Sequence, residues 1–216
     1  MTLLLLLGIS LLFALLLAFI GDWKYAPEIN ILGSVAACSA SIALAIEVYL
    51  HGSFTAGHKF FFVDAFNVYL AVLTAFVSMT TAIFSRRYMR VERQHGRVGR
   101  WRMRFYHAMY QLFIFAMLLA LLTNNVGVLW ISMELATLAT VLLVSLYRTP
   151  NAIEAAWKYF ILCGVGIAQA LFGTVLLYFA AERVLGIGGE ALLWTNLSQV
   201  SSQLEPTVLR LAFVFF

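Results

Sequence analysis

Charged residues are scarce in this sequence, and their scarcity decides the broad class of protein. Only 11% of the 216 residues are charged, while 63% are hydrophobic and the mean hydropathy is +0.93. Soluble domains carry about 25% charged residues. The composition therefore indicates an integral membrane protein. Its net charge of +4 comes from one basic segment, so we expect no nucleic-acid partner.

Cysteine and signal-peptide features are also nearly absent. Cys38 and Cys163 both lie within apolar runs, which argues against a disulfide framework and a thiolate metal site. The N-terminus has neither a basic leading region nor a small-residue cleavage site. We therefore expect its apolar run to be a retained helix.

The histidines do not fit a membrane cytochrome, which holds haem between histidines at similar depth on facing helices. His51 and His58 fall in a predicted outer connection, His95 in the basic segment, and His107 at the inner end of an apolar run. No Cys-rich or Gly-rich cofactor motif is found. We expect no cofactor, no metal ion and no catalytic redox centre within this chain.

Long apolar runs dominate what is present. A membrane-spanning helix needs about 20 apolar residues. The sequence predicts an all-α polytopic membrane helix bundle with six full transmembrane helices and a partial seventh near Thr207–Phe216. The six runs are Leu3–Ile20, Ile29–Leu50, Val63–Ser85, Phe105–Thr123, Asn125–Leu146 and Trp157–Ala180. Ten residues of helix rise only about 15 Å, so we expect the seventh run to be half a span of a longer subunit.

A run of arginines predicts the orientation. We expect a basic loop between spans three and four, which the positive-inside rule places in the cytoplasm, with the N-terminus and the Ala181–Pro206 connection outside. Its arginines are Arg86, Arg87, Arg90, Arg93, Arg97, Arg100, Arg102 and Arg104. Local signals are Asp64 as a cap of span three and Thr149-Pro150 as the start of span six. The short turn Thr123–Asn125 predicts that spans four and five are antiparallel neighbours.

Glu134 is the most informative residue, because it lies midway along the apolar run Asn125–Leu146. A carboxylate at that depth costs about 2.5 kcal/mol or more and normally faces protein or a watery cavity. Gly127 and Thr137 share its helix face. Two interpretations follow: a proton-carrying or charge-pairing group, or a neutral glutamic acid that locks two helices together.

Helix six offers further candidates. Lys158 lies about two turns into it and is predicted either to pair with Glu154 at i,i+4, snorkelling to the interface, or to border a polar path toward Glu134. Lys158 lies on nearly the same helix face as Gln169, which forms a close-packing stripe with Gly166 and Gly173. Glu47 lies about one turn from the outer end of span two, where its carboxylate can reach the interface, so a functional role is less favoured there.

These segments resemble a known superfamily. The stretch from Asn124 through Trp130-Ile-Ser-Met-Glu134, continuing through Arg148-Thr-Pro to Trp157-Lys158-Tyr, is similar to the antiporter-like membrane subunits of respiratory complex I, Mrp-type sodium/proton antiporters and group 4 hydrogenases. Asp64-Ala-Phe-Asn-Val-Tyr and Ser85-Arg-Arg-Tyr88 also resemble it. These sequence motifs look closest to the F component of hydrogenase-4 and formate hydrogenlyase-like complexes.

The resemblance implies subunits of about fourteen helices, in which helices four to eight and nine to thirteen form inverted repeats. It implies that Glu134 pairs with a lysine of helix seven beyond residue 216. We assign proton translocation to Glu134 and Lys158. Residues 1–104 would hold helices one to three and the basic segment, and residues 105–216 the start of the first repeat.

The predicted function is therefore a membrane subunit of an energy-converting NADH/quinone- or hydrogenase-type oxidoreductase, contributing part of a proton or sodium half-channel. Other membrane subunits, the lipid bilayer and a prokaryotic inner membrane are the expected surroundings. A non-transporting structural anchor and an unrelated solute transporter or receptor are the alternatives.

Overall fold

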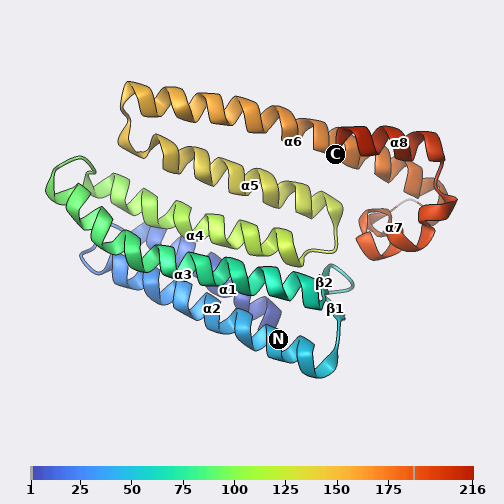
Figure 1. Ribbon diagram of the computed structural model, residues 1–216, viewed down its shortest axis with the longest axis horizontal. Coiled ribbons are helices and arrows are strands. Elements are labelled where there is room, and N and C mark those ends of the chain that lie inside the picture. Colours follow the sequence, from blue (N-terminus) through green and yellow to red (C-terminus); the bar gives the residue numbers. More distant parts are fainter. Residues whose placement is uncertain (1, 187) are drawn as a thin grey trace.

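The computed structural model describes residues 2–186 and 188–216, and helices dominate it (Figure 1). Six of these helices are long and apolar enough to cross a membrane, which confirms the predicted helical membrane bundle. Their bounds are α1 Thr2–Ile20, α2 Ala26–His51, α3 Ala65–Gln94, α4 Arg100–Leu122, α5 Val126–Val144 and α6 Pro150–Leu185. Shorter helices follow, namely α7 Trp194–Val200 and α8 Pro206–Phe215.

Helices α1 to α4 form a bundle, from which α5, α6 and α8 extend in a row (Figure 1). Leu6, Leu44, Ile114 and Leu118 are fully buried between the first four helices. In contrast, α5 lies between α4 and α6 and packs mainly against these two helices. Spans four, five and six thus form a layer rather than a three-helix core.

Local sequence chemistry explains where several helices begin. The Asp64 carboxylate accepts a hydrogen bond from the Asn67 backbone N–H at 2.7 Å, so the predicted cap of α3 is confirmed. Asn125 caps α5, and Thr149 caps α6 ahead of Pro150 at its first position. These side chains satisfy N–H groups that the first helical turn leaves unpaired.

The predicted arginine loop is mostly helical, which corrects the sequence interpretation. Arg86, Arg87, Arg90 and Arg93 continue α3, and Arg100, Arg102 and Arg104 begin α4. The eighth arginine, Arg97, lies in the turn that connects α3 to α4. Arginine is a good helix former, so a change from apolar to charged residues ends the apolar run without ending the helix. The division at residues 104 and 105 consequently falls inside α4.

The opposite end of the bundle carries a small β structure that the sequence interpretation did not include. Strand β1 (Phe54–Ala56) pairs antiparallel with β2 (Phe61–Val63), with Thr55 opposite Phe62. The turn between α4 and α5 adds to it, because Thr123 bridges to Phe61 and Asn125 bridges to Leu193. The predicted short turn is therefore an extended tripeptide between two connections.

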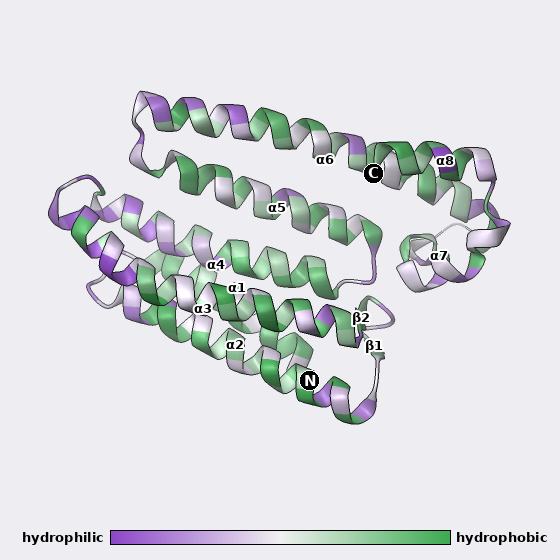
Figure 2. Ribbon diagram, viewed as in Figure 1, coloured by the Kyte–Doolittle hydropathy of each residue, from purple (hydrophilic) through white to green (hydrophobic). Residues whose placement is uncertain are grey.

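Apolar residues are exposed on the outside of the molecule as well as buried inside it, and they make up most of the middle stretches of the long helices (Figure 2). Leu15, Ile46, Phe84 and Leu162 are exposed on four different helices. In water such a surface would be unfavourable, whereas hydrocarbon tails solvate it. Polar residues concentrate at the helix ends and in the connections, as expected where a bilayer meets water.

Candidate functional site

Glu134 lies at the middle of α5 and is half-buried. Small residues surround it on the helix: Ser132, Ala136 and Thr137 are buried, and the Thr137 hydroxyl donates to the Met133 carbonyl at 3.0 Å. Within residues 2–186 and 188–216, the Glu134 carboxyl group makes no hydrogen bond or ion pair. The helix-locking interpretation predicts such a bond to a neighbouring helix, so the described contacts do not support it.

Two other residues of α5 fasten it to α6. The Trp130 indole N–H donates to the backbone carbonyl of Ile167 at 2.7 Å. Near the other end, the Thr140 and Tyr159 hydroxyl oxygens are 3.1 Å apart. These hydrogen bonds fix the antiparallel register of the two helices. Interpolation between them puts Glu134 level with Cys163 and Gly164.

That register gives Glu134 a depth. Helix α6 has 36 residues, and such a helix is about 54 Å long, well beyond the roughly 30 Å hydrocarbon core. Ile167 is near its midpoint, so Glu134 lies within about 6 Å of the middle of the span. The sequence expectation of a carboxylate at mid-depth is consistent with this placement.

Lys158 is exposed and forms an ion pair with Glu154 one turn earlier. It lies about six residues, or roughly 9 Å along the helix axis, from the level of Glu134. The same helix geometry puts Lys158 about 14 Å along the axis from the midpoint of α6. The expected i,i+4 pair is therefore present, and no described contact joins Lys158 to Glu134.

The predicted stripe on α6 is divided between two surroundings. Gly173 is buried against α8, where an added Cβ would lie 3.1 Å from the carbonyl oxygen of Ala212. Gly166 and Gln169 are exposed, and an added Cβ on Gly166 would meet nothing within 4 Å. Within the described residues, helix packing thus uses only the Gly173 end of the stripe.

Asn124 is a structural residue that the sequence interpretation missed. Its side-chain amide donates to the Lys59 carbonyl at 2.8 Å and to the Thr195 hydroxyl at 2.9 Å. Its backbone bonds Phe60 and Trp194. A polar Asn-Asn pair between two apolar runs is the signal that would have indicated such a role. Asn124 therefore joins the hairpin to α7.

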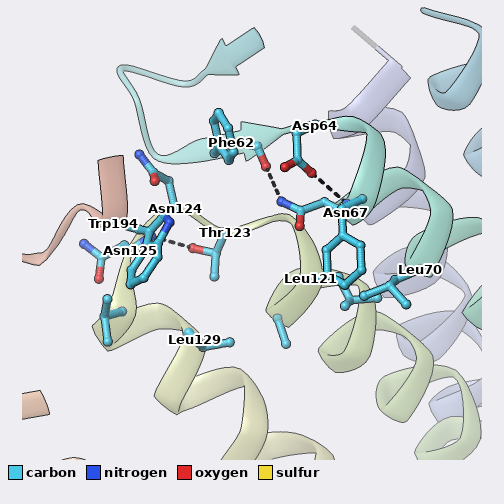
Figure 3. Close-up of a pocket in the computed structure, with 13 residues that line it drawn as sticks. Phe62, Asp64, Asn67, Leu70, Leu121, Thr123, Asn124, Asn125, Leu129 and Trp194 are labelled. Carbon is cyan, nitrogen blue, oxygen red and sulfur yellow. Dashed lines mark hydrogen bonds between the residues drawn. The ribbon is translucent and has the colours of Figure 1, made fainter. Parts of the chain in front are cut away.

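A cavity of about 430 Å³ lies beside this junction (Figure 3). Its walls come from the start of α3, the end of α4, the start of α5, and Trp194. Asp64, Asn67, Thr123 and Asn125 supply polar groups to it (Figure 3). The cavity-lining residue furthest along α5 is Leu129. It lies five residues, or about 7.5 Å along the helix axis, from Glu134.

Residues 123–215 match the family described as NADH:quinone oxidoreductase/Mrp antiporter, TM. Over 201 residues the chain is 43% identical to a hydrogenase-4 component F homologue of Methylacidiphilum infernorum, covering 93% of this chain and 41% of that protein. The resemblance to antiporter-like membrane subunits is confirmed. The chain spans about two fifths of that relative's length.

A second relative covers less of this chain. Subunit N of an NADH-quinone oxidoreductase from Dehalococcoides mccartyi is 38% identical over 82 residues, which are 38% of this chain and 17% of that protein.

Solved structures confirm the fold. A chain of an archaeal membrane-bound sulfane sulfur reductase superposes with a TM-score of 0.83 at 18% identity, covering 99% of this chain and 42% of its own. A chain of respiratory complex I from Thermus thermophilus gives 0.70 at 20% identity, covering 97% and 42%. All four of these proteins belong to membrane or respiratory assemblies or are homologues of their components.

Proposed function

We propose that this chain contributes part of a proton-conducting route to an energy-converting oxidoreductase complex in a prokaryotic inner membrane, and that Glu134 takes up and releases the proton. The observation that carries the proposal is a half-buried carboxyl group at mid-depth with no partner in the described part of the chain. Such a group is free to change protonation state as its surroundings change. The similarity to antiporter-like subunits supports the same function.

The neighbours of Glu134 favour exchange over locking. Trp130 and Thr140 hold α5 to α6, so Glu134 is not needed for this contact. An approaching ammonium group stabilises an ionised carboxylate. A lysine supplied outside these 216 residues, as the resemblance implies, would therefore switch the proton affinity of Glu134.

Lys158 has a secondary role in this proposal. Its ion pair with Glu154 lies near the start of α6, where both side chains reach water. From there Lys158 sets the local charge near the aqueous end of the route. Thr137 and the open surface at Gly166 and Gln169 lie deeper and leave room for water beside α5 and α6.

The test is proton flux in the assembled complex that contains this chain, reconstituted in vesicles. Glu134→Gln keeps the shape of the side chain but cannot ionise, so flux is expected to fall by at least about tenfold while assembly persists. Lys158→Ala is expected to be milder. Glu47→Gln is the matched control, because Glu47, near the end of α2, is also half-buried but accepts a hydrogen bond from Thr2 of α1.

Two outcomes would contradict the proposal. Flux that survives Glu134→Gln would favour a non-transporting structural anchor. Equal losses in Glu134→Gln and Glu47→Gln would show that any change of a half-buried carboxylate damages the complex. Repeating the assay with a sodium gradient instead of a proton gradient decides between the two ions.

A further inference from the structure

Buried polar side chains without partners gather where α2, α3 and α4 meet. Among residues 2–186 and 188–216, six buried side-chain nitrogen or oxygen atoms lack a hydrogen-bond partner. Five of the six belong to Glu28, Arg86, His107 and Gln111. These residues lie in the first four helices, away from Glu134, and neither the proposed function nor the comparisons assign them a role.

Gln111 defines the inner end of this cluster. It is fully buried, and its Nε2 donates to the Asn30 carbonyl at 3.0 Å, to Asn30 Oδ1 at 2.9 Å, and to Ser34 Oγ at 3.1 Å. These acceptors fix the orientation of the amide, because only its nitrogen donates. The Oε1 atom of Gln111 therefore points elsewhere, and it has no partner.

His107 lies one helical turn before Gln111 on the same face of α4. It is 1% exposed, and neither of its ring nitrogens has a partner. A neutral imidazole has one donor and one acceptor, and both normally find partners when buried. His107 and Gln111 thus leave three unsatisfied atoms on one side of one helix.

Charged residues connect the cluster to the surface. Glu28 at the start of α2 lies 2.6 Å from Arg86 and 3.6 Å from Arg90, both on α3. The side chains of Glu28 and Arg86 are 35% and 42% exposed, although one oxygen of Glu28 and the Nε of Arg86 are buried and unpartnered. The pair therefore has one side in contact with the surface and another facing inward.

Water is the ligand that suits this mixture of groups. The unpartnered atoms include acceptors on Glu28 and Gln111, a donor on Arg86, and a donor and an acceptor on His107. Water both donates and accepts, and a buried water typically makes two to four hydrogen bonds to such groups. A side chain that only donates, or one that only accepts, would leave some of these atoms without a hydrogen-bond partner.

We propose that this junction is a hydrated site, in which water extends inward from the Glu28–Arg86 pair to Gln111 and His107 exchanges a proton with that water. A ring nitrogen of His107 accepts a proton from a hydronium ion, which becomes water, and returns it to water later. The site serves proton exchange at the arginine-rich end of the bundle and is separate from Glu134.

Few other titratable groups face His107. From α2 there is Glu28, which pairs with Arg86 and Arg90 of α3. Helix α5, which also packs against α4, has Glu134 as the one titratable side chain in its sequence. On α4 itself Tyr106 lies beside the His107 ring, and Tyr110 donates to the Ser78 carbonyl. Helix α1, which packs against α4, has no titratable side chain in its sequence. Among these groups, the histidine is the one that ordinarily titrates near neutral pH.

The test is exchange of the imidazole C2 hydrogen with deuterium, measured by mass spectrometry on the full chain in lipid nanodiscs across a range of pH. The exposed residues His51, His58 and His95 are references within the same molecule. A hydrated, titrating His107 is expected to exchange within about tenfold of His95 and to follow a sigmoidal pH profile. A dry His107 would exchange only through local opening, at least about a hundredfold more slowly. That result would overturn the proposal.

A variant separates hydration from simple mobility. Gln111→Leu removes an acceptor and fills the site with apolar atoms, so His107 exchange is expected to slow by about tenfold while His95 is unchanged. Gln169→Leu is the matched control, since Gln169 is exposed on α6. An unchanged His107 rate in Gln111→Leu would contradict the proposed site, and the wild-type comparison decides the question if that variant does not fold.

Discussion

Trp130 and Glu134 lie one turn apart on α5 and have different tasks. Trp130 donates to a backbone carbonyl of α6 and so holds the two helices together. Glu134 makes no such bond in the described part of the chain. A fixed neighbour and a free carboxyl group are both needed if the carboxyl is to change charge without moving the helices.

The first residue-scale prediction concerns this fastening. Trp130→Phe keeps an aromatic ring but removes the indole N–H donor, so it is expected to lower the free energy of unfolding by about 0.5–1.5 kcal/mol. Trp157→Phe is the control, because Trp157 is exposed on α6. Reversible unfolding in mixed micelles measures both. Equal effects of the two substitutions would show that the indole hydrogen bond adds nothing.

Some of the site was predictable from local sequence, and some was not. The cap at Asp64, the start of α6 at Thr149-Pro150 and the Glu154–Lys158 pair depend on residues within four positions of each other. The burial of His107 and Gln111 depends on α2, about 80 residues away in the sequence. Apolar periodicity carries no information about such distant partners, so it did not predict that these two residues are buried.

At the scale of helices, the apolar runs predicted the six spans but not where each helix ends. Hydropathy reports the solvent of a segment, whereas the helix continues as long as its backbone bonds are made. This is why α3 and α4 extend through the arginines. Glu28 bonds two of these arginines, so the helical ends also pack against α2.

The two glycines of α6 give a matched pair for an element-scale prediction. Gly173→Val places carbon atoms against the backbone of α8, while Gly166→Val enters open space. Gly173→Val is therefore expected to loosen α8 and raise amide hydrogen exchange in Pro206–Phe215 by about tenfold, and Gly166→Val to leave it unchanged. If both variants behaved alike, the α6–α8 contact described above would be wrong.

At the scale of the whole molecule, a four-helix bundle carries a layer of α5, α6 and α8 (Figure 1). The bundle is more deeply packed, because 44% of the apolar stretch of α4 is buried and 11% of that of α6. The arginines at one end of the bundle predict the orientation across the membrane, because positive charge is retained on the cytoplasmic side.

Cysteine labelling tests that orientation. In a background without Cys38 and Cys163, a cysteine at Arg97 is expected to react with a membrane-impermeant thiol reagent only from the cytoplasmic side. A cysteine at Gly188 is expected to react only from the outside, since the two positions lie at opposite ends of the helices. Reaction of Arg97→Cys from the outside would reverse the proposed topology.

The most direct test of the central claim observes the carboxyl group of Glu134 itself. Infrared difference spectra of the assembled complex, recorded as turnover begins, report a carboxyl group that gains or loses a proton through its carbonyl band. We predict a carboxyl band that disappears in Glu134→Gln and persists in Glu47→Gln. A band that persists unchanged in Glu134→Gln would contradict the assignment of Glu134 as the proton-carrying group.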